Sequence, residues 1–173
     1  MLTQRSILNQ AIIFSLTILF PIAGNTQEKN TQAEKKLTAG PKDDLEKVSP
    51  GKIDANAKKK FTTTKSGLKY RVLRKGKSDG QKPTAENEVT VHYKGWLDNQ
   101  KIFDSSYRRN EKISFPLNRV IAGWTEGMQL VREGGMIELE IPAKLGYGNR
   151  DVGNGLIPAN STLHFVVELY QVK

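Results

Sequence analysis

The sequence contains no cysteine among its 173 residues, and it holds only two histidines and two tryptophans. Without cysteine the chain forms no disulfide, performs no thiol chemistry and takes no lipid on an N-terminal cysteine. The motifs of nucleophile-elbow hydrolases, zinc metalloproteases and phosphate-binding loops are also missing. These absences constrain the mechanism, and we predict no cofactor and no metal site.

Long hydrophobic runs are missing as well. The apolar run at residues 11–22 is interrupted by Ser15, Thr17 and Pro21, and it is too short for a comfortable membrane span. With Arg5 before it, the run is typical of a secretory signal. We therefore predict a signal peptide over residues 1–24 and export to the periplasm or the exterior, without stable membrane insertion after cleavage. An uncleaved anchor is the alternative.

The charge is basic but not clustered. The formal net charge is +9, residues 25–60 carry nine lysines and six acidic residues, and residues 61–173 carry seventeen basic and twelve acidic ones. Nucleic-acid binding needs a basic stripe with exposed aromatic residues, whereas the aromatic residues here fall at alternating, core-like positions. We expect no specific nucleic-acid binding, and weak electrostatic attraction to polyanions at most.

Residues 25–60 differ in amino-acid composition from the rest of the chain. They are polar, almost free of aromatic residues, and interrupted by Gly40-Pro41 and Pro50-Gly51. The composition predicts a flexible, disordered linker between the signal peptide and a domain over residues 61–173. The run Lys58-Lys59-Lys60 is interpreted as solvated, with an interaction patch as the alternative.

The domain is patterned mainly as strands. Apolar residues alternate with polar ones in short segments separated by turn residues, at residues 68–74, 89–97, 101–106, 113–117, 137–141 and 163–169. One segment, residues 120–131, instead repeats apolar residues at helical spacing, with Asn118 as a candidate cap and Gly134-Gly135 as a stop. This order predicts an α+β fold, an antiparallel sheet wrapped around one short α-helix.

Trp124 is the largest apolar side chain of the predicted helix. It is either a plain core residue or the floor of an apolar pocket, and the pattern of the helix leaves both open. The two histidines, His92 and His164, stand on the polar faces of predicted strands without an obvious partner, so we expect both to be exposed. Asp104 ends a predicted strand and is either a turn cap or a functional acid.

An apolar and aromatic set with few polar members remains as the candidate site. Such a set suits an apolar ligand held by a few oriented hydrogen bonds. Its members are Tyr93, Phe103, Asp104, Ile113, Val120, Ile121, Trp124, Tyr147, Ile157 and Phe165.

Several linked motifs in this set resemble the FKBP-type peptidyl-prolyl cis-trans isomerases across residues 61–173, closest to secreted bacterial members. The matching segments are Val91-His92-Tyr93-Lys94-Gly95-Trp96-Leu97, Phe103-Asp104-Ser105-Ser106, Val120-Ile121-Ala122-Gly123-Trp124, Gly146-Tyr147-Gly148, Ile157-Pro158-Ala159-Asn160-Ser161-Thr162-Leu163 and Phe165-Val166-Val167-Glu168-Leu169. Ile113 stands where the best-known small members often have an aromatic residue. The resemblance implies a curled antiparallel sheet around the helix.

The resemblance also implies roles. The substrate proline ring would lie over Trp124, the Ile121 N–H would hold a substrate carbonyl, and the Tyr147 hydroxyl would donate a second bond. Asp104, oriented by Tyr93, would sit beside the bond being twisted. The implied substrate-binding residues are Phe103, Ile113, Val120, Trp124, Leu156, Ile157 and Phe165.

The implied activity is acceleration of X-Pro bond rotation in exported proteins, which assists their folding. The implied partners are proline-containing polypeptides and the macrolide inhibitors of the family, and the protein is expected to be a monomer. A non-catalytic chaperone module that binds proline peptides is the alternative, since it would keep the same pocket.

Overall fold

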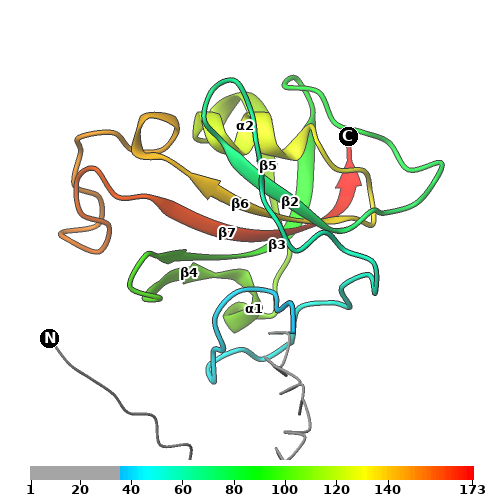
Figure 1. Ribbon diagram of the computed structural model, residues 1–173, viewed down its shortest axis with the longest axis horizontal. Coiled ribbons are helices and arrows are strands. Elements are labelled where there is room, and N and C mark those ends of the chain that lie inside the picture. The colour runs from blue at the N-terminus through cyan, green and yellow to red at the C-terminus, as the bar shows by residue number, and fades with distance from the viewer. Residues whose placement is uncertain (1–35) are drawn as a thin grey trace, which may run out of the picture. The chain divides into compact units, whose positions relative to one another are not determined.

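The computed structural model describes residues 36–173, and the predicted signal peptide lies outside them. Its main element is a seven-stranded antiparallel sheet in the order β1-β2-β6-β7-β3-β4, with β5 paired to β3 (Figure 1). The strands are β1 (Thr62–Thr63), β2 (Lys69–Arg74), β3 (Glu88–Leu97), β4 (Ile102–Ser105), β5 (Ile113–Pro116), β6 (Met136–Ile141) and β7 (Leu163–Val172). The predicted α+β class with an antiparallel sheet around a helix is confirmed.

The two long central strands explain the division of the sheet into two faces. β3 and β7 pair through Tyr93 and Val167, and successive side chains of a strand point to opposite faces. Phe165 and Val167 belong to the main core with the helix, whereas Val166 belongs to a second cluster with Trp96. Both faces of the sheet are therefore apolar, and each needs a cover.

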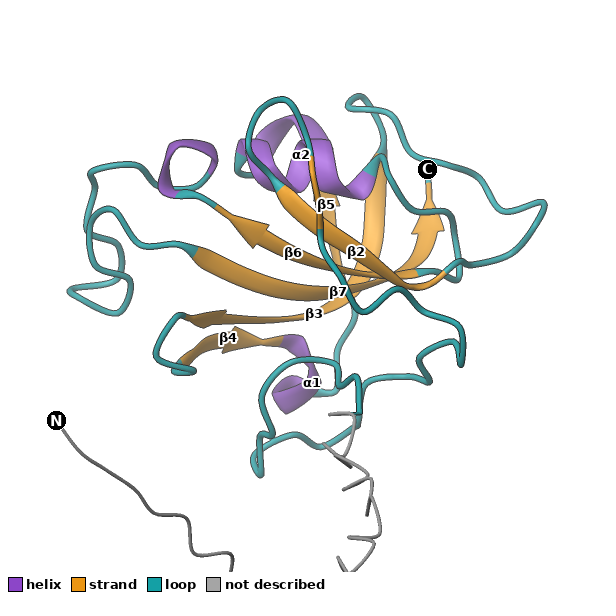
Figure 2. Ribbon diagram, viewed as in Figure 1, coloured by secondary structure: helices purple, strands orange, loops and turns teal. Residues whose placement is uncertain are grey.

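The helix α2 (Ala122–Met128) covers the first face (Figure 2). It lies very close to β6, because a Cβ added at Gly123 would stand 2.5 Å from the Cγ2 atom of Ile141. The helix is shorter than the predicted segment 120–131. Its N-cap is Ile121 without a side-chain cap, not Asn118, because Asn118 lies within a separate 3-10 turn, Leu117–Arg119.

The second face is covered by residues 36–60, which we call the N-terminal strap, and by the short helix α1 (Ser106–Arg109). Leu37, Ala39 and Ile53 of the strap pack against the cluster of Trp96. The expected flexible linker through residue 60 therefore needs correction, since residues 36–60 contact the sheet. Residues 25–35 lie outside the described part of the chain.

Burial of polar side chains beneath the strap follows from this cover. Lys94 is 2% exposed and binds Glu46 at 2.9 Å and the carbonyl oxygen of Pro41 at 2.8 Å. Glu168 is 1% exposed and accepts hydrogen bonds from Arg74 and from the backbone N–H of Gly51. Charges without partners would be costly here, so these bonds hold the strap on the sheet.

Two further sequence expectations differ from the structure. His92 is buried rather than exposed, because α1 lies over it: its Nδ1 atom is 2.8 Å from the Ser106 hydroxyl and its ring stacks on Tyr107. Helix α1 itself lies between the predicted strands at residues 101–106 and 113–117, where turn residues were expected. None of the helices within residues 36–173 has the length and apolar character needed to span a membrane.

Candidate functional site

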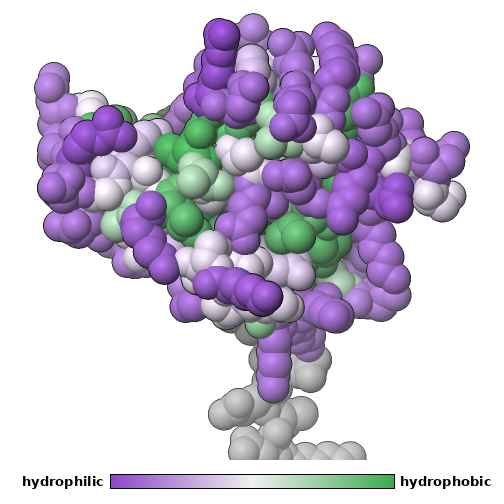
Figure 3. All heavy atoms as spheres, turned by 90° about the horizontal axis from the view of Figure 1, so that it is seen from above, coloured by the Kyte–Doolittle hydropathy of each residue, from purple (hydrophilic) through white to green (hydrophobic). Residues whose placement is uncertain are grey.

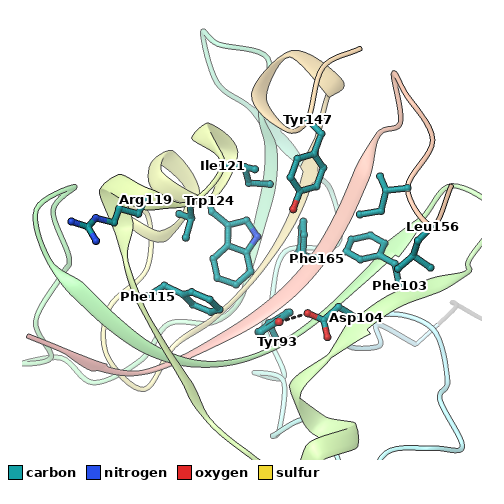
Figure 4. Close-up of a pocket in the computed structure, with 12 residues that line it drawn as sticks. Tyr93, Phe103, Asp104, Phe115, Arg119, Ile121, Trp124, Tyr147, Leu156 and Phe165 are labelled. Atoms are coloured by element: carbon teal, nitrogen blue, oxygen red, sulfur yellow. Dashed lines mark hydrogen bonds between the residues drawn. The ribbon is translucent and has the colours of Figure 1, made fainter. Parts of the chain in front are cut away.

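A cavity of about 540 Å³ opens between α2, the concave side of the sheet and the loop that follows β6 (Figure 4). Half of the lining residues are aromatic, and the loop contributes the aliphatic Leu156 and Ile157 as well as Tyr147. The lining residues are Tyr93, Phe103, Asp104, Phe115, Arg119, Val120, Ile121, Trp124, Tyr147, Leu156, Ile157 and Phe165.

The indole of Trp124 is held in place by three rings that meet it edge-on. Ring centroids lie 5.3 Å from Tyr93, 5.3 Å from Phe165 and 5.7 Å from Phe115, with planes 82–88° apart. Edge-to-face contacts of this kind are favourable because a positive ring edge meets a negative ring face. Trp124 is only 4% exposed and still lines the cavity, so both interpretations of this residue, core and pocket floor, hold together.

A polar cluster forms one wall. The Tyr93 hydroxyl donates to Asp104, Arg109 Nη1 lies 2.7 Å from Asp104 Oδ1, and Arg109 Nη2 lies 3.4 Å from the Tyr93 hydroxyl. Burial and the neighbouring Asp104 carboxylate raise the pKa of Tyr93 well above its ordinary value, so the hydroxyl stays protonated and remains a donor. Two residues therefore fix the direction of the Asp104 carboxylate.

Arg109 was not identified from the sequence. It comes from α1, whose first residue follows β4 directly, so the helix carries it back toward Asp104. The hydrogen bond to Asp104 raises the pKa of Arg109. Its spacing of five positions from Asp104 would point to this contact only if the short helix were already known.

Three hydrogen-bond donors around the cavity are unused by the described part of the protein. The indole Nε1 of Trp124 is buried and has no partner. The backbone N–H of Ile121 and the hydroxyl of Tyr147 also donate to no other residue within 36–173. In Figure 4 the Tyr147 hydroxyl points into the space between Trp124 and Phe165. A buried donor without a partner is costly, so this site is suited to a ligand that carries acceptors.

The rim opposite Arg119 comes from the loop after β6. Tyr147 follows a 3-10 turn, Ala143–Leu145, and Leu156 and Ile157 stand beside the bridge between Val152 and Ile157. Leu156 is 38% exposed, and Figure 4 shows it next to Phe103. The exposed side chain of Leu156 extends the hydrophobic wall of the cavity toward solvent.

All predicted site residues line the cavity except Ile113. Ile113 and Phe115 share one face of β5, and both pack on the core. The larger ring of Phe115 reaches Trp124, and Phe115 lines the cavity where Ile113 was expected. Arg119 at the rim was also missed, because an isolated arginine in a turn gives no sequence signal. Within the described residues, no group of three or more acidic or histidine side chains is arranged to hold a metal ion.

The curled sheet, the short helix on its concave face and the aromatic cavity with unused donors define a binding domain for an apolar ligand that carries carbonyl groups. The sequence model of the FKBP-type peptidyl-prolyl cis-trans isomerases matches residues 79–170. The chain therefore belongs to this family, and the resemblance in its motifs is confirmed.

Similar sequences and solved structures point to the same family. The chain is 49% identical over 114 residues to a probable FKBP-type isomerase of Haemophilus influenzae, covering 66% of this chain and 46% of the relative. It is 46% identical over 135 residues to FkpA of Aeromonas hydrophila, covering 76% of this chain and 49% of that relative. The crystal structure of FkpA from Escherichia coli matches with a TM-score of 0.62 and 47% identity, over 67% of this chain and 53% of that one. The chain thus spans about half the length of these proteins.

Proposed function

We propose that this protein is a peptidyl-prolyl cis-trans isomerase that accelerates rotation about X-Pro bonds in polypeptides and so assists their folding. The observation that carries the proposal is the aromatic cavity around Trp124, together with its three unused donors. Family membership supports the same activity.

The reaction needs no nucleophile. Resonance holds the peptide bond planar with a barrier of about 18–20 kcal/mol, and an uncatalysed X-Pro bond takes tens to hundreds of seconds to rotate, on the order of a slow folding step. Twisting breaks the resonance and reduces the charge separation of the amide. A dry, apolar cavity therefore favours the twisted state over the planar one. Lowering the barrier by about 5 kcal/mol would give roughly several thousand-fold acceleration.

Each wall has a role in this mechanism. The proline ring lies on the indole of Trp124, and Phe103 and Phe165 exclude water beside it. The Ile121 N–H and the Tyr147 hydroxyl hold substrate carbonyl oxygens, which fixes the chain on both sides of the rotating bond. The carboxylate of Asp104, oriented by Tyr93 and Arg109, faces the carbonyl carbon as the amide twists.

The test is a protease-coupled assay on the full chain with a cis-proline peptide. We expect Trp124→Leu and Asp104→Asn each to lower kcat/KM by about tenfold or more, and Tyr170→Phe, on an exposed tyrosine of β7, to leave it unchanged. Circular dichroism confirms that each variant folds. Wild-type protein that binds the peptide without accelerating isomerisation would refute the enzyme and leave a non-catalytic binding module.

We further propose that the protein is exported by residues 1–24, acts as a monomer on proline-containing polypeptides, and takes the macrolide inhibitors of the family in the same cavity. The cavity volume of about 540 Å³ and the aromatic walls support binding of a bulky apolar ring. Cell fractionation tests the export, and inhibition of the isomerase assay by a macrolide tests the shared site.

A further inference from the structure

A second cavity lies away from the aromatic one. Its volume, about 550 Å³, is close to that of the first, and the two share no lining residue. The aromatic cavity contacts Ile121 and Trp124 at the start of α2, whereas the second contacts Leu130 and Arg132 beyond its end. A seven-residue helix is about 10 Å long, so the cavities are separate sites.

The second cavity, which we call the cationic groove, has more basic side chains in its lining than acidic ones. Six of them come from four stretches of the chain: Lys58, Lys60, Arg71, Lys75, Lys82 and Arg132. The only acidic residue in the lining is Asp54, and its carboxylate already accepts the backbone N–H of Lys75 at 3.0 Å. Folding therefore gathers an excess of positive charge that the sequence spreads over more than seventy positions.

The arginines and lysines of the groove differ in whether they already form ion pairs and hydrogen bonds. Arg71 binds Glu138 at 2.7 Å and the carbonyl oxygen of Lys59 at 2.6 Å, and Arg132 donates to the Gly80 carbonyl. The ammonium groups of Lys58, Lys60, Lys75 and Lys82 have no ion pair or hydrogen bond within residues 36–173. Four positive charges thus line the groove without an ion pair, in excess over the single negative charge of Asp54, and like charges held together repel.

The floor of the groove is not polar. Tyr70, Val72 and Leu130 contribute side chains to it, and none of the three is fully buried. Thr62, on the terminal strand β1 of the sheet, stands at its side, where an extended chain would meet a strand edge. Hydrophilic side chains cover most of the face shown in Figure 3, with hydrophobic ones in patches between them. The lining of the groove combines basic and apolar side chains, which suits a ligand that is both charged and apolar.

We propose that the cationic groove is a second binding site, for an acidic polypeptide segment that carries both carboxylates and apolar side chains. The carboxylates pair with the four lysines, and the apolar side chains contact Tyr70, Val72 and Leu130. A phosphate polymer fits less well, because it has nothing to place on the apolar floor. A membrane surface fits less well, because it is flat and the groove is concave.

The test measures binding of a fluorescent peptide to the full chain by anisotropy at low salt. The peptide alternates Asp or Glu with Leu or Val and contains no proline, which keeps it out of the aromatic cavity. We expect the double variants K58E/K60E and K75E/K82E each to weaken binding by about tenfold. The control K65E/K101E reverses two exposed lysines outside the groove and should change binding less than about twofold. Isomerase activity should stay unchanged in all three.

Three results would overturn the proposal. If the control double variant weakens binding as much as the others, the attraction is a property of the net charge. If only K58E/K60E matters, the ligand binds the lysine run and not a folded groove. If inorganic polyphosphate or anionic phosphatidylglycerol vesicles bind, and the acidic peptide and poly-glutamate do not, the ligand class is wrong.

Discussion

At the scale of single residues, the site depends on side chains that hold one another rather than on a reactive group. Asp104 touches both Tyr93 and Arg109, and Trp124 touches three rings. Rings with two rotatable angles lose little entropy on ordering, so such a cluster stays in the geometry that substrate needs. The residues of the cluster should therefore act through their position. Substitutions that keep the shape of a side chain but remove its polar atom show how much of its effect comes from hydrogen bonding and how much from packing.

Tyr93→Phe is such a change. It keeps the ring against Trp124 and removes the hydroxyl that donates to Asp104. Losing one oriented hydrogen bond of about 1–1.5 kcal/mol predicts a fall in kcat/KM of roughly five- to tenfold, with little loss of thermal stability. Steady-state isomerisation rates with Tyr170→Phe as control check this. Unchanged kinetics would mean that the orientation of Asp104 does not matter.

At the scale of elements, the strands were predictable and their covers were not. A period of two along β3 and β7 shows which residues are apolar on one face, and the cavity residues follow from that face and from the motifs. The polar face of β3, with His92 and Lys94, looks exposed in the sequence. It is buried because the strap lies over Lys94 and helix α1 lies over His92, and no local pattern encodes either contact.

The site residues that prediction missed have two physical origins. Arg109 depends on a four-residue helix and Arg119 on a 3-10 turn, and both elements are too short for periodicity to reveal. Phe115 lies on a strand that was predicted, but the alternation of that strand does not show whether Ile113 or Phe115 reaches Trp124. Residues on elements that the sequence pattern did reveal, such as Tyr93, Trp124 and Phe165, all line the cavity as expected.

Helix α2 is positioned by its glycines, which gives an element-scale prediction. A methyl group at Gly123 would stand 2.5–3.0 Å from three atoms of the fully buried Ile141. Overpacking costs about 1–3 kcal/mol, more than the roughly 1 kcal/mol that alanine gains as a helix former. Gly123→Ala should therefore lower the unfolding free energy and raise KM, since the adjacent Trp124 moves with the helix.

Urea unfolding and isomerase kinetics measure these two effects. The matched control is Ala122→Ser, on the exposed neighbour, which should change stability by less than about 0.5 kcal/mol. A Gly123→Ala protein as stable as the wild type would show that the helix can move away from β6 without loss of unfolding free energy.

At the scale of the whole molecule, the strap joins the back of the sheet to the site. Asp43 binds Arg108 at 2.7 Å, and the Lys47 N–H donates to the Tyr107 carbonyl at 3.1 Å. Both partners are in α1, next to Arg109. The strap therefore supports the helix that orients Asp104, although it does not line the cavity itself.

Removing the strap tests this connection. A chain that begins at residue 61 exposes the Trp96 cluster and leaves Lys94 and Glu168 without several partners, which should cost several kcal/mol, on the order of a buried ion pair. For a domain of this size each lost kcal/mol lowers Tm by about 4 °C. A chain that begins at residue 36 keeps the strap contacts described above and is the reference for the comparison. Equal melting temperatures for the two truncations would show that the strap is not part of the folded core.

Burial of His92 predicts a pH dependence for the whole fold. The ring lies between Ser106, Tyr107 and Tyr170. Burial lowers the pKa of His92 below its usual 6.5, and nearby Lys112 lowers it further, against an opposing effect of Glu168. Between the lowered pKa and about 6.5 the unfolded chain binds a proton that the folded chain does not. The unfolding free energy contributed by this site is therefore complete above about pH 6.5 and falls as the pH drops below it.

Urea unfolding of wild type and His92→Gln from about pH 8 down to pH 5 measures this contribution, because carboxylates common to both proteins cancel in the difference. The wild type should lose stability relative to the variant as the pH falls. His164→Gln, which alters the partly exposed pair with Asp98, should keep the part of the slope that belongs to His92. A difference curve that is flat, or that rises toward low pH, would mean that the folded chain protonates His92 as readily as the unfolded one, and that α1 and the strap do not seal this face of the sheet.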